Sequence, residues 1–266
     1  MLITVALLVA LVPLVAVLFD VVHRGAHLFR PDFFTKPIPT ARHRGPGMGP
    51  AVVGTIIITF WATLIAVPLG ILAAVYVVEY GAGNRLSGVI RFMSDVMAGV
   101  PSIVMGLFIF AVFTLKFGFL GIGGSLALAC LMLPIVIRST EAILRLVPQE
   151  MREASEALGA SRSRTVLTVV LPAALAGITS GCLLAIVRAA GETAPLLFTI
   201  GYITDRANWN VFGGANTTLS AQIFSLASSS SYQGATDTAW TAALTLIVMV
   251  PVVARLITSR FAVRTS

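Results

Sequence analysis

The sequence predicts an all-α polytopic membrane protein with about six transmembrane helices. Apolar residues make up 57% of the 266-residue chain and charged residues only 11%, and the mean hydropathy is +0.95. A soluble domain carries about a quarter charged residues, so this chain lacks the polar residues needed to cover a water-facing surface. A soluble enzyme, a disordered chain and a compact DNA-binding domain are therefore excluded. The net charge of +7 fits arginine-rich loops at a membrane surface, and we expect no nucleic-acid partner.

Six apolar runs reach, or nearly reach, the roughly 20 residues that cross a bilayer core as a helix. In chain order they are 1–22, 51–78, 89–115, 120–138, 173–199 and 238–259. We expect them to form a single transmembrane domain over residues 1–266. The first run lacks a basic leading region and a small-residue cleavage site, so we interpret it as a span and not as a signal peptide.

The charged residues between the runs predict the orientation. The segments after the second, fourth and sixth runs together carry more arginines than the segments on the opposite side. Because cytoplasmic loops are enriched in Lys and Arg, both termini and the cytoplasmic loop 139–172 are expected in the cytoplasm. The first connecting segment, which is basic and rich in proline and glycine, argues weakly for the reverse orientation.

Neither a metal site nor a disulfide framework is expected. Cys130 and Cys182 lie inside apolar runs, where small packing residues are the simpler interpretation. His23, His27 and His43 lie in a polar segment without an acidic cluster.

The chain also has no P-loop. That motif needs a lysine followed by Ser or Thr, whereas Lys36 and Lys116, the only lysines, precede Pro37 and Phe117. We therefore expect no ATPase activity and no catalytic residues in this polypeptide.

Segment 148–172, between the fourth and fifth runs, predicts a helix–turn–helix. Pro148 suits the first turn of a helix, and Glu150 and the following acidic residues suit its positive end. Gly159 suits the helix stop, and Ser161 suits the cap of a second helix that runs to Pro172.

The first of these two helices is predicted to be amphipathic. Met151, Ala154 and Leu158 recur at helical spacing beside an acidic face. Such a helix fits a groove on another protein. The alternative is a solvated loop between two spans, because short motifs alone are weak evidence.

The spacing of the segment resembles the EAA loop of ABC-importer permeases, whose coupling helix sits in a cleft of the ATPase subunit. Two positions depart mildly from that pattern: Ser155 replaces the second alanine, and Val169 stands at a usual isoleucine position. The resemblance implies a type I ABC importer permease fold and an ATPase-coupling role for Glu153, Ala154, Ser155, Gly159, Leu171 and Pro172.

Two further stretches are similar to the phosphate-specific (Pst) permeases of the PstA type: 99–106, with the sequence GVPSIVMG, and 188–199, with the sequence RAAGETAPLLFT. This resemblance implies a high-affinity importer of inorganic phosphate in the bacterial cytoplasmic membrane. It also implies a second permease subunit (PstC type), an ATP-binding subunit dimer that holds ATP and Mg, an extracytoplasmic phosphate-binding protein, and no cofactor on this chain.

The residues themselves make this substrate plausible. Arg188 is the one cation well inside a predicted span, and a charge there costs roughly 2.5–3.5 kcal/mol on insertion scales, which marks a functional candidate. Arg188 and Glu192 are four residues apart, on one helix face, and the guanidinium fork matches phosphate oxygens. Gly191 and Pro195 are expected to interrupt this helix and expose backbone N–H groups.

Arg91 and Asp95 form a second pair at the same spacing, leading into a break at Gly99–Pro101. The predicted substrate path therefore comprises Arg188, Glu192, Thr193, Arg91, Asp95 and Ser102.

Three alternatives remain at this point. In each ion pair, the two side chains could merely neutralise one another at a membrane boundary. The permease could carry another oxyanion, molybdate or sulfate, because an arginine favours an anion without separating tetrahedral ones. The chain could also be a stand-alone channel or a secondary carrier.

Overall fold

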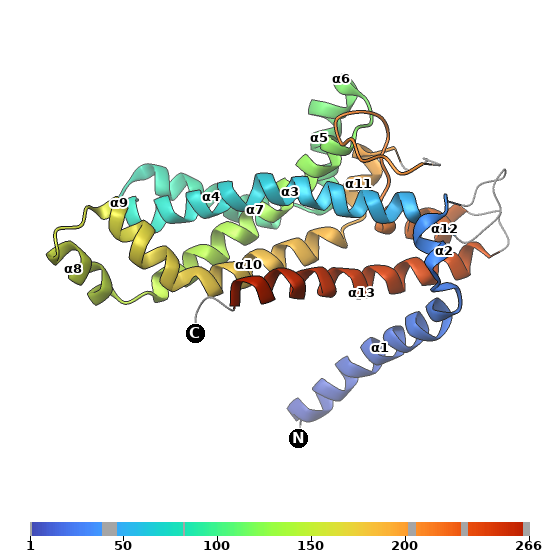
Figure 1. Ribbon diagram of the computed structural model, residues 1–266, viewed down its shortest axis with the longest axis horizontal. Coiled ribbons are helices and arrows are strands. Elements are labelled where there is room, and N and C mark those ends of the chain that lie inside the picture. Colours follow the sequence, from blue (N-terminus) through green and yellow to red (C-terminus); the bar gives the residue numbers. More distant parts are fainter. Residues whose placement is uncertain (1, 39–46, 82, 202–205, 230–233, 263–266) are drawn as a thin grey trace.

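The computed structural model describes residues 2–38, 47–81, 83–201, 206–229 and 234–262; His43 lies outside them. Every regular element in the described residues is helical, which confirms the all-α prediction. Long helices run side by side along an elongated bundle, with the small helices α8 and α9 at one end and α2 and α12 at the other (Figure 1).

Three helices build the core of the bundle: α3 (Gly49–Val75), α7 (Gly121–Leu146) and α10 (Leu171–Ala190). Helix α3 faces the core with small residues four apart, and all of them are buried: Ala62, Ala66, Gly70 and Ala74. A Cβ at Gly70 would lie 2.7 Å from Val136 of α7. Small residues let helix backbones approach closely, so this stripe explains the tight α3–α7 packing.

Five described helices are long and apolar enough to cross a membrane: Thr4–Leu28, Gly49–Tyr80, Gly121–Leu146, Arg162–Ala190 and Ala235–Val252. A sixth span exists if the bent pair Arg85–Gly99 and Ser102–Phe117 counts as one. The count agrees with the predicted number of about six.

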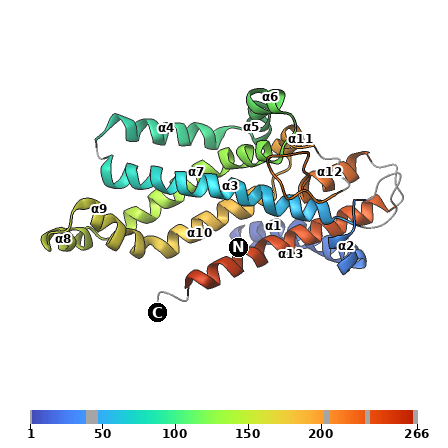
Figure 2. The same ribbon diagram turned by 45° about the horizontal axis from the view of Figure 1, so that its top comes forward.

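The bent pair corresponds to the third span expected at 89–115, and its break falls at the predicted Gly99–Pro101 position. Helix α4 (Arg85–Gly99) and helix α5 (Ser102–Ile109), which continues to Phe117, meet at an angle of 106°. Pro101 has no N–H to continue the helix, and it disfavours helical geometry at the preceding residue; Val100 is extended, with ψ of 128°. Helix α4 packs against α7, and α5 turns away from the direction of α4 (Figure 2).

The cytoplasmic loop expected at 139–172 is shorter in the structure. Helix α7 continues to Leu146, so the loop begins later than expected. The second helix predicted in segment 148–172 does not stop at Pro172. Helix α9 (Arg162–Thr165) and a π-helical segment (Val166–Val170) lead into α10 without a break. A π-helical turn changes the hydrogen-bond register, which accommodates the missing N–H of Pro172.

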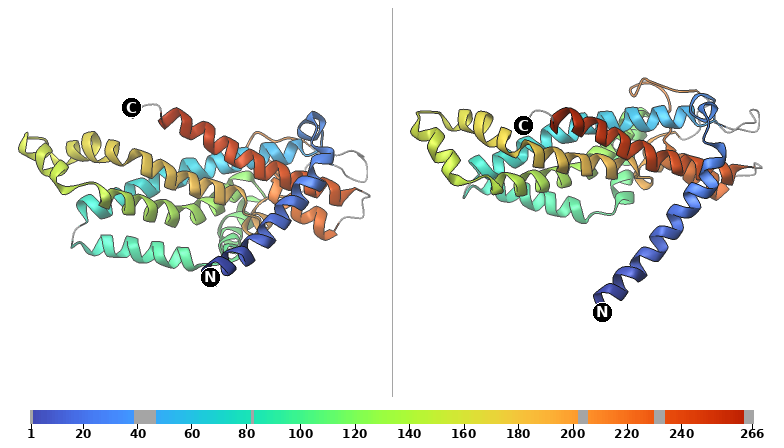
Figure 3. Two further views of the ribbon diagram at one scale, coloured as in Figure 1. Left: turned by 90° about the horizontal axis from the view of Figure 1, so that it is seen from below. Right: turned by 60° about the horizontal axis from the view of Figure 1, so that its bottom comes forward.

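Two further helices pack at the edge of the bundle. Helix α1 (Leu2–Gly25) contacts α13 (Ala235–Ala262) near the α2 end and then diverges from the bundle (Figure 3). Helix α12 (Leu219–Ser229), between the fifth and sixth predicted spans, packs on α13. Helix α2 (Pro31–Thr35) and α12 supply Phe33 and Leu219 to a second buried cluster at this end.

Candidate functional site

The last turn of α10 places Arg188 next to a helix break. Helix α10 ends at Ala190, and α11 (Ala194–Thr199) begins after three intervening residues, which is the interruption predicted from Gly191 and Pro195. The Nε of Arg188 lies 3.8 Å from Oε1 of Glu192. The Arg188 side chain is 70% exposed and that of Glu192 20% exposed, so the guanidinium faces away from the chain's own core.

Contacts from two other helices hold the break in place. Ser220 of α12 donates a hydrogen bond of 2.8 Å from Oγ to the carbonyl of Glu192. Helix α5 packs on α11 so closely that a Cβ at Gly106 would lie 2.5 Å from Cα of Pro195. The interrupted helix is therefore a fixed feature of the fold, with backbone groups positioned beside Arg188.

The other path candidates divide into two places. Thr193, which precedes α11, and Ser102, in the first turn of α5, belong to the packed α5–α11 pair and are both half-buried. Arg91 and Asp95 lie elsewhere, on the face of α4 that packs against α7. The structure thus brings four of the predicted path residues to the region of the break and leaves two apart from it.

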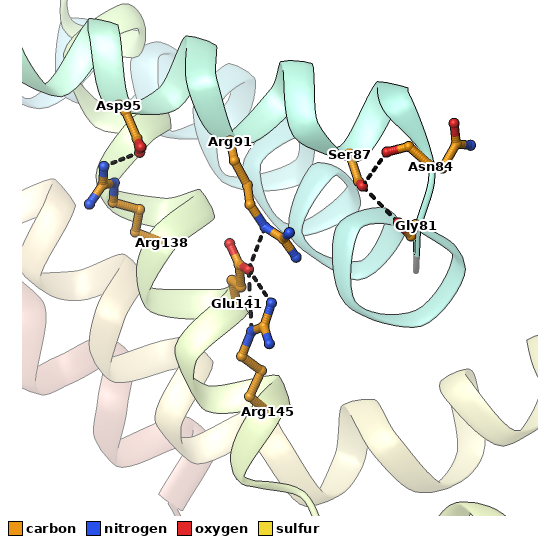
Figure 4. Close-up of polar contacts among 8 residues, drawn as sticks. All are labelled: Gly81, Asn84, Ser87, Arg91, Asp95, Arg138, Glu141 and Arg145. Carbon is orange, nitrogen blue, oxygen red and sulfur yellow. Dashed lines mark hydrogen bonds and ion pairs between the residues drawn. The ribbon is translucent and has the colours of Figure 1, made fainter.

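The predicted pairing of Arg91 with Asp95 is wrong. Arg91 donates from Nε to Oε1 of Glu141 on α7, at 2.9 Å, and Asp95 accepts from Arg138, also on α7 (Figure 4). Arg145 binds the same Glu141 oxygen at 2.8 Å. Spacing along one helix predicted a local pair, but the neighbouring helix offers partners of opposite charge at closer range.

The coupling segment forms α8 (Gln149–Ala157), with Pro148 just before its first residue. Gly159 has a φ of +84°, as predicted for a left-handed helix stop. The N–H of Ala160 bonds the carbonyl of Ser155 at 3.2 Å, and the N–H of Gly159 bonds that of Glu156 at 2.9 Å. This is the Schellman arrangement that satisfies the last carbonyls of a helix.

The outer face of α8 is open. Glu153 and Ala154 are exposed, Met151 is 41% exposed and Leu158 is 90% exposed. The helix therefore presents a small apolar stripe outward, at one end of the bundle (Figure 1).

A side-chain contact accounts for Ser155 at the position where the EAA pattern usually has alanine. Its Oγ lies 2.9 Å from Oγ1 of Thr165, and Thr165 is buried at the end of α9. The hydroxyl pair ties α8 to the helix that continues into the span. Leu171 and Pro172 follow in the first turn of α10.

An anchor that the sequence analysis missed is the ion pair between Arg152 and Glu79. Arg152 Nη2 lies 2.9 Å from Glu79 Oε1, and the two side chains are 14% and 5% exposed. Arg152 also donates to the carbonyls of Leu144 (3.0 Å) and Val147 (2.6 Å). Glu79 lies in the π-helical segment (Tyr76–Tyr80) at the end of α3, so this pair fixes α8 to two spans.

The available signal for this anchor was Glu79 itself, a lone carboxylate at the end of an apolar run. Its partner is 73 residues away, so sequence spacing does not identify it. The pair borders a cavity of about 570 Å³ between α8, α9 and the ends of α3 and α7.

The chain matches the family model described as "Binding-protein-dependent transport system inner membrane component" over residues 66–262. The match begins within α3 and covers the remaining helices, including the break and the coupling helix. The chain belongs to this family.

Curated relatives agree with the resemblance to the phosphate permeases, which is thereby confirmed. The chain is 45% identical to the "Phosphate transport system permease protein PstA" of Mycobacterium leprae (strain TN), over 91% of this chain and 81% of that protein. It is 44% identical to the protein of the same name from Yersinia pestis, over 70% of this chain and 63% of that protein. As a member of this permease family, the chain is a multi-pass transport subunit and not an enzyme.

Solved structures agree on the fold. A chain of the MetNI methionine ABC transporter in an inward-facing conformation matches with a TM-score of 0.59 at 20% identity, over 78% of this chain and 89% of that chain. A chain of an amino acid ABC transporter with histidines matches with a TM-score of 0.57 at 22% identity, over 80% and 92%. The predicted ABC-importer permease architecture is confirmed.

Proposed function

We propose that this chain forms half of a heterodimeric translocation path for inorganic phosphate, driven by ATP hydrolysis on a separate subunit. The observation that carries the proposal is Arg188, 70% exposed beside the α10–α11 break, in a chain whose relatives are named phosphate permeases. A guanidinium exposed within a membrane-spanning region needs water, an anion or a partner subunit. A phosphate path between two permease subunits supplies all three.

Glu192 tunes this site. It lies near enough to balance Arg188 when the path is empty, and it weakens anion binding enough for release because a carboxylate repels phosphate. Thr193 and Ser102 add polar groups from the adjacent helices.

The partners follow from the same assignment. The open face of α8 docks on a dimer of ATP-binding subunits, which hold ATP and Mg. A second permease subunit completes the path, and an extracytoplasmic phosphate-binding protein delivers the ion. The α8 end of the bundle and both termini lie on the cytoplasmic side of the bacterial inner membrane, in contact with membrane lipid.

The test is phosphate uptake by the full complex in proteoliposomes. Arg188→Lys keeps the charge but loses the two-pronged fork, so uptake falls. Arg188→Ala stops uptake and leaves Glu192 without its counter-ion. The decisive variant removes both charges: if Arg188 contacts phosphate, the double variant Arg188→Ala, Glu192→Ala inserts normally and still carries none. Normal uptake by this double variant contradicts the proposed path.

A second arm measures specificity. Sulfate and molybdate compete with labelled phosphate in the same vesicles, and we expect neither to displace it at equal concentration. Transport of one of them in preference to phosphate assigns the path to that oxyanion. Uptake without the ATP-binding subunits would instead indicate a channel or a carrier.

A further inference from the structure

A second cluster of charges lies between α4 and α7, further toward the α8 end than Arg188. It consists of Arg91, Asp95, Arg138, Glu141 and Arg145 (Figure 4). These side chains surround a cavity of about 310 Å³, which Ser94 also lines. The cavity is open to the surface, and its charged side chains other than Glu141 are at least 42% exposed.

The cluster has more positive charge and more donors than its acids use. Three guanidiniums face two carboxylates. Oε1 of Glu141 accepts from both Arg91 and Arg145, whereas Arg138 donates only from Nη2 to Asp95 among the contacts of the described residues. A guanidinium offers five N–H donors, so most donor positions around the cavity are left for another acceptor.

Ser94 provides an independent observation. It is 3% exposed, and its Oγ has no hydrogen-bond partner within the described part of the chain. Buried hydroxyls are nearly always hydrogen-bonded. Ser94 lines the same cavity as the three arginines, so its unpaired hydroxyl lies close to the position that an anion would take there.

We infer that this α4–α7 cluster is a binding site for a phosphate group. Arginine forks match tetrahedral oxyanions in two-pronged geometry, and Ser94 adds a neutral donor. The occupant is either inorganic phosphate leaving the path or the headgroup phosphate of an anionic lipid. The inference deepens the proposed function when the occupant is the ion, but binding at the cluster does not depend on Arg188.

The experiment reads the cluster directly. Ala142, which is exposed and lines the same cavity, is changed to cysteine in a chain carrying Cys130→Ala and Cys182→Ala. The full complex is placed in nanodiscs, and the rate of labelling by a small thiol reagent is followed. In neutral-lipid nanodiscs, added inorganic phosphate slows the labelling, whereas potassium chloride of equal ionic strength does not.

The variants separate a binding site from a structural contact. Arg91→Gln weakens the protection about tenfold, the effect of losing one charge-assisted hydrogen bond, and Ser94→Ala weakens it less. Arg85→Gln, on the exposed first turn of the same helix, leaves protection unchanged. Labelling at the original rate without phosphate shows that each variant still forms the cavity.

The lipid arm identifies the source of the phosphate group. Protection in phosphatidylglycerol nanodiscs without added phosphate, reversed by Arg91→Gln, assigns the site to a lipid headgroup. Absence of protection in both nanodiscs overturns the inference. This experiment measures labelling and not uptake. A complex that transports no phosphate therefore contradicts the proposed function, whereas the labelling result tests the α4–α7 site on its own.

Discussion

At the scale of single residues, two polar contacts attach α8 to the membrane-spanning bundle. The Arg152–Glu79 pair joins α8 to the end of α3, and the Ser155–Thr165 hydroxyl pair joins it to the span that begins with α9. Arg152 and Ser155 are partly buried, whereas Met151 and Leu158 of the same segment are exposed. With the bond from Arg152 to the carbonyl of Leu144, these contacts join α8 to the ends of α3 and α7 and to the span that begins with α9.

Arg152→Met tests the first attachment. The substitution strands the Glu79 carboxylate, whose side chain is 5% exposed, and breaking a buried pair costs about 3–5 kcal/mol. We expect a lower unfolding temperature of the complex and loss of phosphate-stimulated ATP hydrolysis. Glu79→Gln combined with Arg152→Met restores part of the stability, because no buried charge remains unpaired. Arg164→Gln, an exposed control on α9, leaves both measurements unchanged.

Ser155→Ala is the milder counterpart. Removing one hydrogen bond of 2.9 Å costs about 0.5–1.5 kcal/mol, so the complex stays folded and coupling falls only slightly. Thr165→Val gives the same loss, and the double variant adds little to either one. Strictly additive losses would show that the two hydroxyls act independently.

At the scale of elements, two glycines decide where helices end and how closely they pack. Gly159 ends α8 in a left-handed conformation, and Gly106 lets α5 lie against α11. The first has open space around it and the second has none. Substitutions at these positions therefore fail for different physical reasons.

Gly159→Val is penalised only by its backbone. A β-branched residue disfavours positive φ, and the left-handed conformation costs L-residues about 1–2 kcal/mol. We expect the protein to insert and assemble, with reduced transport-linked ATP hydrolysis. Gly159→Asn retains more activity, because asparagine tolerates this conformation. Equal activity of both variants would mean that the left-handed stop is unimportant for coupling.

Gly106→Ala is penalised by contact. A Cβ there meets the backbone of Pro195 at 2.5 Å, and overpacking of this kind costs about 1–3 kcal/mol. We expect lower thermal stability and weaker phosphate uptake, because α11 moves away from its position beside Arg188. Gly99→Ala, on the same bent pair with nothing within 4 Å, is the matched control and should behave as the natural protein does.

At the scale of the whole molecule, the exposed features lie at different places on one bundle. Helix α8 occupies one end of the bundle, and α1 diverges from the other helices (Figures 1 and 3). Arg188 lies in the last turn of α10. In the part of the chain that the structure describes, most of α1, the outer face of α8 and the Arg188 side chain are exposed. That arrangement is typical of a subunit that is completed by other chains.

We therefore expect the purified chain to hydrolyse no ATP, and the reconstituted complex to do so. The absence of a P-loop makes the first expectation firm, since phosphate cradling needs that motif or an equivalent. Phosphate-release assays on the chain and on the complex, in parallel, check it. ATP hydrolysis by the chain alone, unchanged by further purification, would contradict the assignment.

Composition and residue spacing alone predicted the helical membrane class and the places where helices stop or break. Apolar content alone predicted a helical membrane chain, because hydrocarbon leaves only closed backbone hydrogen bonding as an option. Gly159, Gly191 and Pro101 predicted a helix stop and two breaks, because these residues act through their own backbone geometry. Such local effects need no knowledge of neighbours.

Only the tertiary structure decided which charged side chains, distant in the sequence, pair with one another. Arg91 and Asp95 looked like a local pair, yet packing of α4 on α7 offers each a different partner. Glu79 meets Arg152 across 73 residues, and the angle of 106° at the predicted Gly99–Pro101 break is set by how α4 and α5 pack. Charges pair with whatever opposite charge the packing brings within reach, and helix spacing describes only one of the helices involved.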